Sequence, residues 1–249
     1  DIDQLTTAEA LPDGSTRIYV AVADVDALVR KKSAIDGHAS YNTTSVYTAA
    51  VIFPMLPEEL STDYTSLNPQ SARIALVIEM LINADGGLVE EDVYLANVYN
   101  HAKLAYDSVS DWLDGEIGIP EAIGSVQGME ENIGLQDSIA QRMHHFRHKH
   151  GALSLETIES RPQFIGNKLQ VLQYSNKNRA KTIVEDFMIT ANGVVARFLS
   201  KHNSPSIRRV VRSPKRWDRI VELAEEYEKG HFTIERNIFL SLHCGLGVD

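Results

Sequence analysis

Two acidic side chains at the start of the sequence have the type and spacing of a magnesium site. Asp1 and Asp3 are one residue apart, and Gln4 follows directly. Mg²⁺ prefers octahedral oxygen ligands and usually takes one or two carboxylates, with water and phosphate oxygens in the remaining positions. A bound Mg²⁺ polarises a phosphodiester and generates hydroxide from water. Asp1 and Asp3 are therefore candidate metal ligands, although on spacing alone a solvated turn is the commoner explanation.

Strand-forming segments surround these acids. Residues 16–24 (TRIYVAVAD) are mostly apolar and β-branched, which is typical of a buried strand. The turn residues 12–15 (PDGS) precede them, so we expect residues 5–10 to form the paired strand directly after the acids. Residues 44–55 form another β-rich run. The acids are thus expected to lie where an antiparallel sheet begins.

A hairpin and a series of helices follow. Residues 84–87 (ADGG) have the composition of a tight turn, which predicts a hairpin between strands at 72–83 and 88–100. Apolar residues recur at helical spacing over residues 179–199. Turn and capping residues predict further helices at 102–113, 132–150, 214–228 and 232–243, with an extended segment at 153–174.

The order of these elements predicts the fold class. Strands come first and helices mostly later, which favours an α+β fold with a mixed, largely antiparallel sheet packed with helices. No linker or repeat interrupts residues 1–249, so we expect one domain. No apolar run of about 18 residues suggests a membrane span. A single cysteine, Cys244, excludes a disulfide framework and favours a reducing, cytoplasmic location.

The charge distribution leaves two interpretations open. The net charge of −10 argues against nucleic acid as a partner, because Lys and Arg neutralise phosphates. Basic residues nevertheless gather near the C-terminus. This stretch is either a solvated surface or a phosphate-facing patch on an acidic protein. Its members are Lys201, Arg208, Arg209, Arg212, Lys215, Arg216 and Arg219.

Two histidines have a zinc-like spacing. His144 and His148 lie four residues apart in a predicted helix. No glutamate follows His144 to complete a metalloprotease motif, and no third ligand is evident. We therefore expect an exposed polar helix end rather than a zinc site.

The sequence resembles the catalytic domain of the RNase II/RNase R family of exoribonucleases along almost its whole length. The resemblance rests on blocks that occur in the same order as in the family: residues 1–5, 19–25, 44–47, 54–61, 66–67, 102–113, 150–153 and 184–192. It implies the fold of the family's RNB-type catalytic domain. It also places one family aspartate before residue 1 and an arginine-rich block after Asp249, so we expect a domain truncated at both ends.

The resemblance implies metal-dependent hydrolysis at the 3′ end of single-stranded RNA, with nucleoside 5′-monophosphates as products. Mg²⁺ is the expected ion and Mn²⁺ the alternative. Asp1 and Asp3 match the first two acids of the family's Asp-x-Asp-Asp motif. Gln4 occupies the third position, where a neutral amide offers a metal an oxygen without negative charge. Because of this departure, the protein could also be a non-standard or catalytically silenced member of the family.

Further residues match RNA-contacting positions of the family. Tyr47 matches an aromatic residue that stacks on a terminal base, and Tyr106 and Glu185 match positions that contact nucleotides near the 3′ end. Pattern alone would make Tyr47 a half-buried strand residue, and Tyr106 and Glu185 ordinary helix-surface residues. The family's second stacking aromatic falls near Ile158, which cannot stack in the same way.

Three functions follow from these observations. The first is a 3′→5′ exoribonuclease, whose full-length form is expected to carry flanking oligonucleotide-binding domains. The second is a catalytically weak or inactive module of the same fold that binds RNA 3′ ends, because Gln4 replaces an acid. The third, an unrelated metal phosphoesterase for small molecules, would make the aromatic positions irrelevant.

Overall fold

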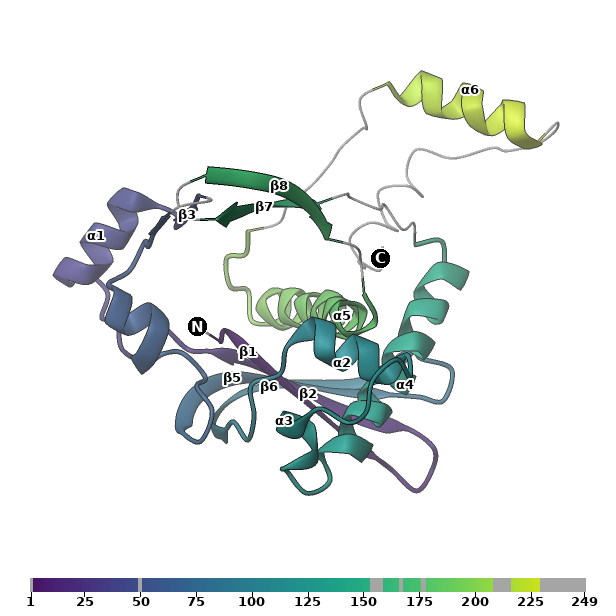
Figure 1. Ribbon diagram of the computed structural model, residues 1–249, viewed down its shortest axis with the longest axis horizontal. Helices are drawn as coiled ribbons and strands as arrows, with labels where there is room; N and C mark the ends of the chain where they lie inside the picture. The colour runs from purple at the N-terminus through teal and green to yellow at the C-terminus, as the bar shows by residue number, and fades with distance from the viewer. Residues whose placement is uncertain are drawn as a thin grey trace.

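A four-stranded antiparallel sheet forms the centre of the molecule. The computed structural model describes residues 2–48, 51–152, 159–165, 168–175, 178–207 and 216–228, with the backbone alone at 159–175 and 224–228. The sheet has the order β1-β2-β5-β6 (Figure 1). Its strands are β1 (Gln4–Ala10), β2 (Thr16–Ala23), β5 (Ala72–Ile82) and β6 (Leu88–Tyr99). The predicted pairing of the strand after the acids is confirmed, with Gln4 opposite Val22 and Ala10 opposite Thr16.

Alternation along the strands gives the sheet two different faces. Ile18 and Val20 are fully buried on one face, together with Ile78 and Met80. Helices α4 (Met129–Lys149) and α5 (Arg179–Lys201) supply the other half of this core. Their fully or nearly fully buried side chains are Ile139, Ala140, Met143, Ile183, Phe187, Ala191 and Val194. The opposite face carries a smaller cluster around Leu67.

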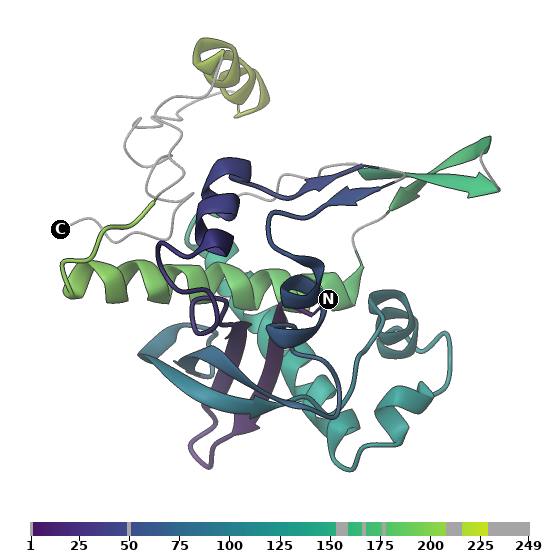
Figure 2. The same ribbon diagram turned by 90° about the vertical axis from the view of Figure 1, so that its left-hand side faces the viewer.

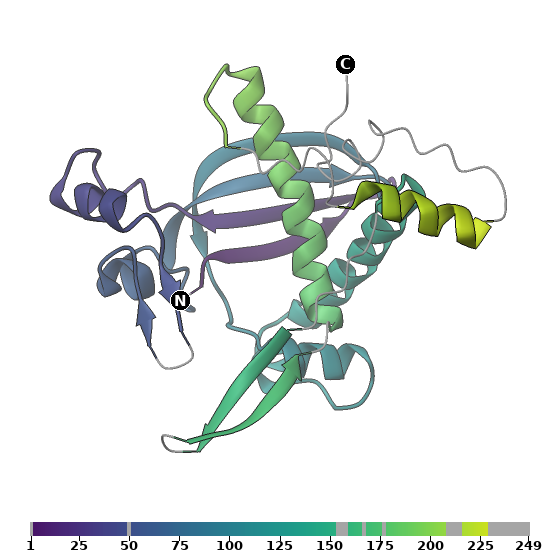
Figure 3. The ribbon, with the colours of Figure 1, turned by 90° about the horizontal axis from the view of Figure 1, so that it is seen from above.

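Helix α5 lies between the sheet and two hairpins. It crosses the strands when the molecule is seen from above (Figure 3). On its far side lie the hairpins β3 (Val46–Tyr47) with β4 (Ile52–Phe53) and β7 (Glu159–Ile165) with β8 (Lys168–Ser175) (Figure 2). One side of α5 therefore contributes to the core, while other positions on the helix are exposed.

Several smaller elements complete the described fold. They are α1 (Ala34–Asn42), the π-helical turn η1 (Leu60–Tyr64), α2 (Tyr106–Leu113), α3 (Glu121–Gly124) and α6 (Trp217–Glu228). The predicted α+β class is confirmed. The helix expected at residues 102–113 begins only at Tyr106, because Ala105 has an extended backbone. Among the described residues, no helix is long and apolar enough to cross a bilayer. The helix expected at residues 232–243 falls outside the described residues.

The turn between β5 and β6 packs closely against α4. Asn83 and Gly87 close the predicted hairpin, with the Asn83 amide 2.9 Å from the Gly87 carbonyl oxygen. Gly86 has a φ of +94°, and a Cβ on it would lie 2.4 Å from the backbone oxygen of Arg142. Only glycine fits both the left-handed conformation and the close approach.

Candidate active site

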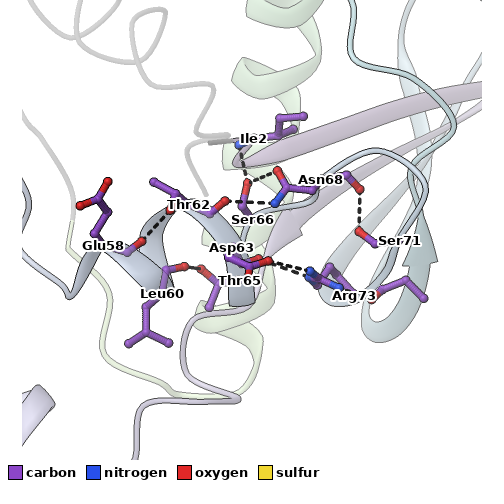
Figure 4. Close-up of polar contacts among 11 residues, drawn as sticks. Ile2, Glu58, Leu60, Thr62, Asp63, Thr65, Ser66, Asn68, Ser71 and Arg73 are labelled. Carbon is purple, nitrogen blue, oxygen red and sulfur yellow. Dashed lines mark hydrogen bonds and ion pairs between the residues drawn. The ribbon is translucent and has the colours of Figure 1, made fainter.

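The backbone around Asp3 is held by hydrogen bonds from two directions. The amide of Ile2 donates to the Ser66 hydroxyl at 2.8 Å (Figure 4). The amide of Leu67 donates to the Ile2 carbonyl at 2.9 Å. On the sheet side, the Ala23 amide donates to the Asp3 carbonyl at 2.9 Å. The position of Asp3 therefore depends on both β2 and the segment that precedes β5.

That segment is itself cross-linked. The Ser66 hydroxyl donates to Asn68 Oδ1 at 3.0 Å, and the Asn68 amide nitrogen donates to the Thr62 carbonyl at 3.0 Å (Figure 4). Asn100, at the end of β6, donates to the Leu67 carbonyl at 2.7 Å in a buried position. Ser66 is almost fully buried, so its hydrogen bonds are shielded from water. Sequence reasoning assigned these residues no role, because their contacts join distant parts of the chain.

A cavity of about 1200 Å³ adjoins Asp3. It runs along β1 and past the segment that connects β6 to α2. Asp3 and Gln4 lie in its wall together with Tyr106. Further polar and aromatic lining comes from Tyr94, Tyr99, His101, Lys103 and Gln136. The size and mixed lining are suitable for a ligand with both apolar rings and polar groups.

The cavity brings together three of the six predicted site residues. These are Asp3, Gln4 and Tyr106, the last with 45% of its surface exposed. Glu185 is exposed on α5 but is not part of the lining, although its neighbour Val184 is. Tyr47 is 72% exposed on β3 and also lies outside the lining. Asp1 lies outside the described residues, as do Ile158, Cys244 and the basic residues at 208–215. The roles assigned to all six residues stay predictions.

The free carboxylate of Asp3 suits a hard metal ion. Within the described part of the chain, no hydrogen bond or ion pair engages this carboxylate. An exposed oxygen donor at a cavity wall is what Mg²⁺ requires of the protein, since water and phosphate oxygens complete the shell. Gln4 adds at most a neutral amide oxygen. The described residues therefore fit a site with Asp3 as one ligand and Asp1 as the predicted second.

One histidine of the pair, His144, takes part in an ion cluster around a buried acid between α4 and α5. Asp186 is fully buried and contacts the guanidinium of Arg147, while His144 Nδ1 lies 3.4 Å from Asp186 Oδ2. Burial raises the pKa of Asp186, and Arg147 and His144 oppose that shift. The His144 and His148 rings pack with centroids 4.3 Å apart. No group of three or more His, Cys, Asp or Glu suited to a metal occurs among the described residues.

Comparison with known proteins assigns the chain to a family. A family model described as RNB domain matches residues 1–240. Ribonuclease R of Vibrio parahaemolyticus is 35% identical over 217 residues, which cover 86% of this chain and 25% of the relative. Exoribonuclease 2 of Escherichia fergusonii is 37% identical over 210 residues, covering 80% of this chain and 31% of the relative. The chain thus spans about a quarter to a third of these relatives.

A solved structure agrees with these sequence matches. Mycoplasma genitalium RNase R, in complex with ribose-methylated single-stranded RNA, superposes with a TM-score of 0.85 at 25% identity. The match covers 97% of this chain and 38% of that protein. The resemblance noted in the sequence is therefore confirmed by both sequence and fold, and the chain belongs to the RNB domain family of the exoribonucleases.

Proposed function

We propose that the full-length protein is a metal-dependent 3′→5′ exoribonuclease that hydrolyses single-stranded RNA to nucleoside 5′-monophosphates. The observation that carries this proposal is the shared cavity, in whose wall the free Asp3 carboxylate, Gln4 and Tyr106 lie together. The family supplies the reaction class, because its relatives are named Ribonuclease R and Exoribonuclease 2. Flanking oligonucleotide-binding domains would extend the RNA path in the full-length protein.

Each predicted residue has a chemical task in this proposal. Asp1 and Asp3 would hold Mg²⁺, or Mn²⁺, which when bound supplies an activated water and offsets charge on the leaving oxygen. Tyr106 and Glu185 would contact nucleotides near the 3′ end, where the 2′-hydroxyl separates RNA from DNA. Tyr47 would stack on a base without selecting its identity, as degradation of any sequence requires.

Turnover of labelled RNA tests the proposal. The full-length protein is incubated with 5′-labelled single-stranded RNA and Mg²⁺, and the products are separated by length. A ladder that shortens from the 3′ end and ends in mononucleotide release supports the exonuclease. Internal cuts, or equal shortening after chelation of the metal, would contradict it.

A second candidate function is RNA 3′-end binding with slow or absent turnover. The observation that favours it is Gln4, which places a neutral amide at the position of the family's third clustered acid. One fewer carboxylate leaves less negative charge to retain a divalent cation. Bound RNA that is never shortened would support this candidate.

Replacing Gln4 with aspartate separates the two candidates. If the protein is a binding module weakened by its amide, Gln4→Asp should raise Mg²⁺-dependent turnover by about tenfold or more, because the restored charge strengthens metal binding. If the native site is already competent, turnover should change by less than about twofold. Single-turnover rates over a Mg²⁺ titration measure this difference, with Gln4→Asn as the matched neutral control.

Replacing Tyr47 with alanine should weaken RNA binding without changing stability. Tyr47 is largely exposed, so its removal sacrifices little packing. Loss of base stacking is worth about 1–3 kcal/mol, or roughly 5–150-fold in Kd. Fluorescence anisotropy with single-stranded RNA provides the measurement. Tyr41→Ala is the control, because Tyr41 is an 87% exposed tyrosine on α1. An unchanged Kd for Tyr47→Ala would contradict the stacking role proposed for Tyr47.

A further inference from the structure

An arginine at the first turn of α5 joins three helices around the cavity. The Arg179 guanidinium makes a two-pronged contact with Asp137 of α4, with Nε–Oδ1 and Nη2–Oδ2 distances of 2.8 and 2.6 Å. Its Nη1 donates to the Leu113 carbonyl at 2.9 Å and contacts Asp114 Oδ1 at 3.3 Å. Because Asp137 is buried and both prongs are occupied, the direction of this contact is well defined.

The N-terminus of α5 also makes hydrogen bonds with two residues of α2. The Arg179 amide donates to the Ser110 hydroxyl at 3.1 Å, and Asn178 Nδ2 donates to Asp107 Oδ1 at 2.8 Å. Asp107 directly follows Tyr106. Asn178 also caps α5, since its Oδ1 accepts from the Lys181 amide at 2.9 Å. We refer to Asn178 and Arg179 with these partners as the Arg179 clamp.

The clamp joins the two helices that carry the residues assigned by the proposed function to nucleotide contact. Tyr106 begins α2, and Glu185 lies six residues after Arg179 on α5. An α-helix holds its residues in a regular geometry, so a contact between α2 and α5 constrains how far apart the side chains on the two helices lie. Tyr106 is half-exposed and Glu185 is exposed, so both side chains are accessible to a ligand.

We propose that the Arg179 clamp is a positioning device that sets the spacing of Tyr106 and Glu185 and thereby the preference of the site for RNA over DNA. The inference rests on the proposed function. A 2′-hydroxyl is recognised through a few hydrogen bonds. Side chains that are already held in place before RNA binds lose less conformational entropy on binding, so their hydrogen bonds contribute more to affinity. Arg179 touches no substrate in this proposal and acts through α2 and α5.

Equilibrium binding of the full-length protein tests the clamp. Kd values for single-stranded RNA and DNA of the same sequence are measured by anisotropy in EDTA, so that turnover does not interfere. Arg179→Met should weaken RNA binding about tenfold and leave DNA binding within about twofold, because only the pre-organised sugar contacts are lost. Arg179→Lys should recover only part of the preference, since an ammonium cannot make both prongs.

Two further variants separate positioning from folding. Arg179→Met leaves Asp137 buried without a cation, which can destabilise the fold. In the double variant Arg179→Met/Asp137→Leu both charges are absent, so we expect near-native thermal unfolding together with the lost RNA preference. Arg197→Met is the matched control, because Arg197 forms a similar pair with Glu91 farther along α5.

The outcomes distinguish the clamp from the proposed function. If the wild type prefers RNA and the folded double variant keeps that preference, the inference is overturned and the proposed function stands. An equal loss in Arg197→Met would also overturn it, because the effect would then belong to α5 as a whole. If the wild type binds neither RNA nor DNA, the proposed function fails and the inference fails with it.

Discussion

Replacing Asp3 with asparagine in the full-length protein should reduce RNA shortening about 10³-fold while RNA binding stays within a few-fold of wild type. The amide is nearly isosteric with the carboxylate, so the hydrogen bond that the Asp3 carbonyl accepts from the Ala23 amide remains. What disappears is one negative charge at the proposed metal site. A metal ion contributes several kcal/mol of charge stabilisation in a transition state, and about 4 kcal/mol corresponds to 10³-fold in rate.

Single-turnover shortening of labelled RNA and anisotropy binding measure the two halves of this prediction. Glu9→Gln is the matched control, because Glu9 is an exposed acid at the other end of β1. It should leave both measurements unchanged. Full activity of Asp3→Asn would contradict the assignment of the metal site. A parallel loss of RNA binding and thermal stability would instead show that the Asp3 carboxylate supports the fold.

Replacing Gly86 with alanine should lower the free energy of unfolding by about 2–5 kcal/mol. The added Cβ would meet the backbone of α4, with Arg142 O at 2.4 Å and Met143 N at 2.8 Å. Neither atom can rotate away, so the turn or the helix must shift, which adds to the cost of a left-handed backbone. For a chain of this size the loss corresponds to a fall in Tm of roughly 5–15 °C.

Gly14 offers a control that isolates the close approach. It also lies in a hairpin turn with a positive φ, +83°, but a Cβ there would meet nothing within 4 Å. Gly14→Ala should therefore cost only about 1–2 kcal/mol, the penalty of the backbone conformation itself. Denaturant unfolding of both variants gives the comparison. Equal destabilisation would show that the contact between the β5–β6 turn and α4 does not constrain the fold.

The local features of the fold could be predicted because they are encoded in neighbouring residues. The apolar, β-branched run at residues 16–24 predicts a buried strand, and residues 84–87 predict a turn. The start of α2 was placed too early. Residues 102–105 have helix-compatible side chains, but they lie outside any helix, line the cavity, and end with an extended backbone at Ala105.

The candidate site was only partly predictable, for a physical reason. The motif around Asp3 is visible in the sequence, but the hydrogen bonds that position it come from Ser66 and Ala23. In the Arg179 clamp, likewise, Arg179 contacts Asp137, which lies 42 positions earlier in the sequence. Such contacts have no periodicity or spacing that a linear pattern can reveal. The family resemblance nominated residues, whereas only the fold shows which of them share a cavity.

The two-sided placement of α5 has a consequence for how such a protein can change over generations. Phe187 and Ile183 fill the core from one side of the helix, and Glu185 is exposed on another. Successive helical residues differ by about 100° around the axis, so a rotation that accommodates a larger core side chain also swings the outward acid. If Glu185 contacts nucleotides as proposed, a core mutation that rotates α5 also changes ligand selectivity, so selection on packing and selection on RNA binding act on the same substitutions.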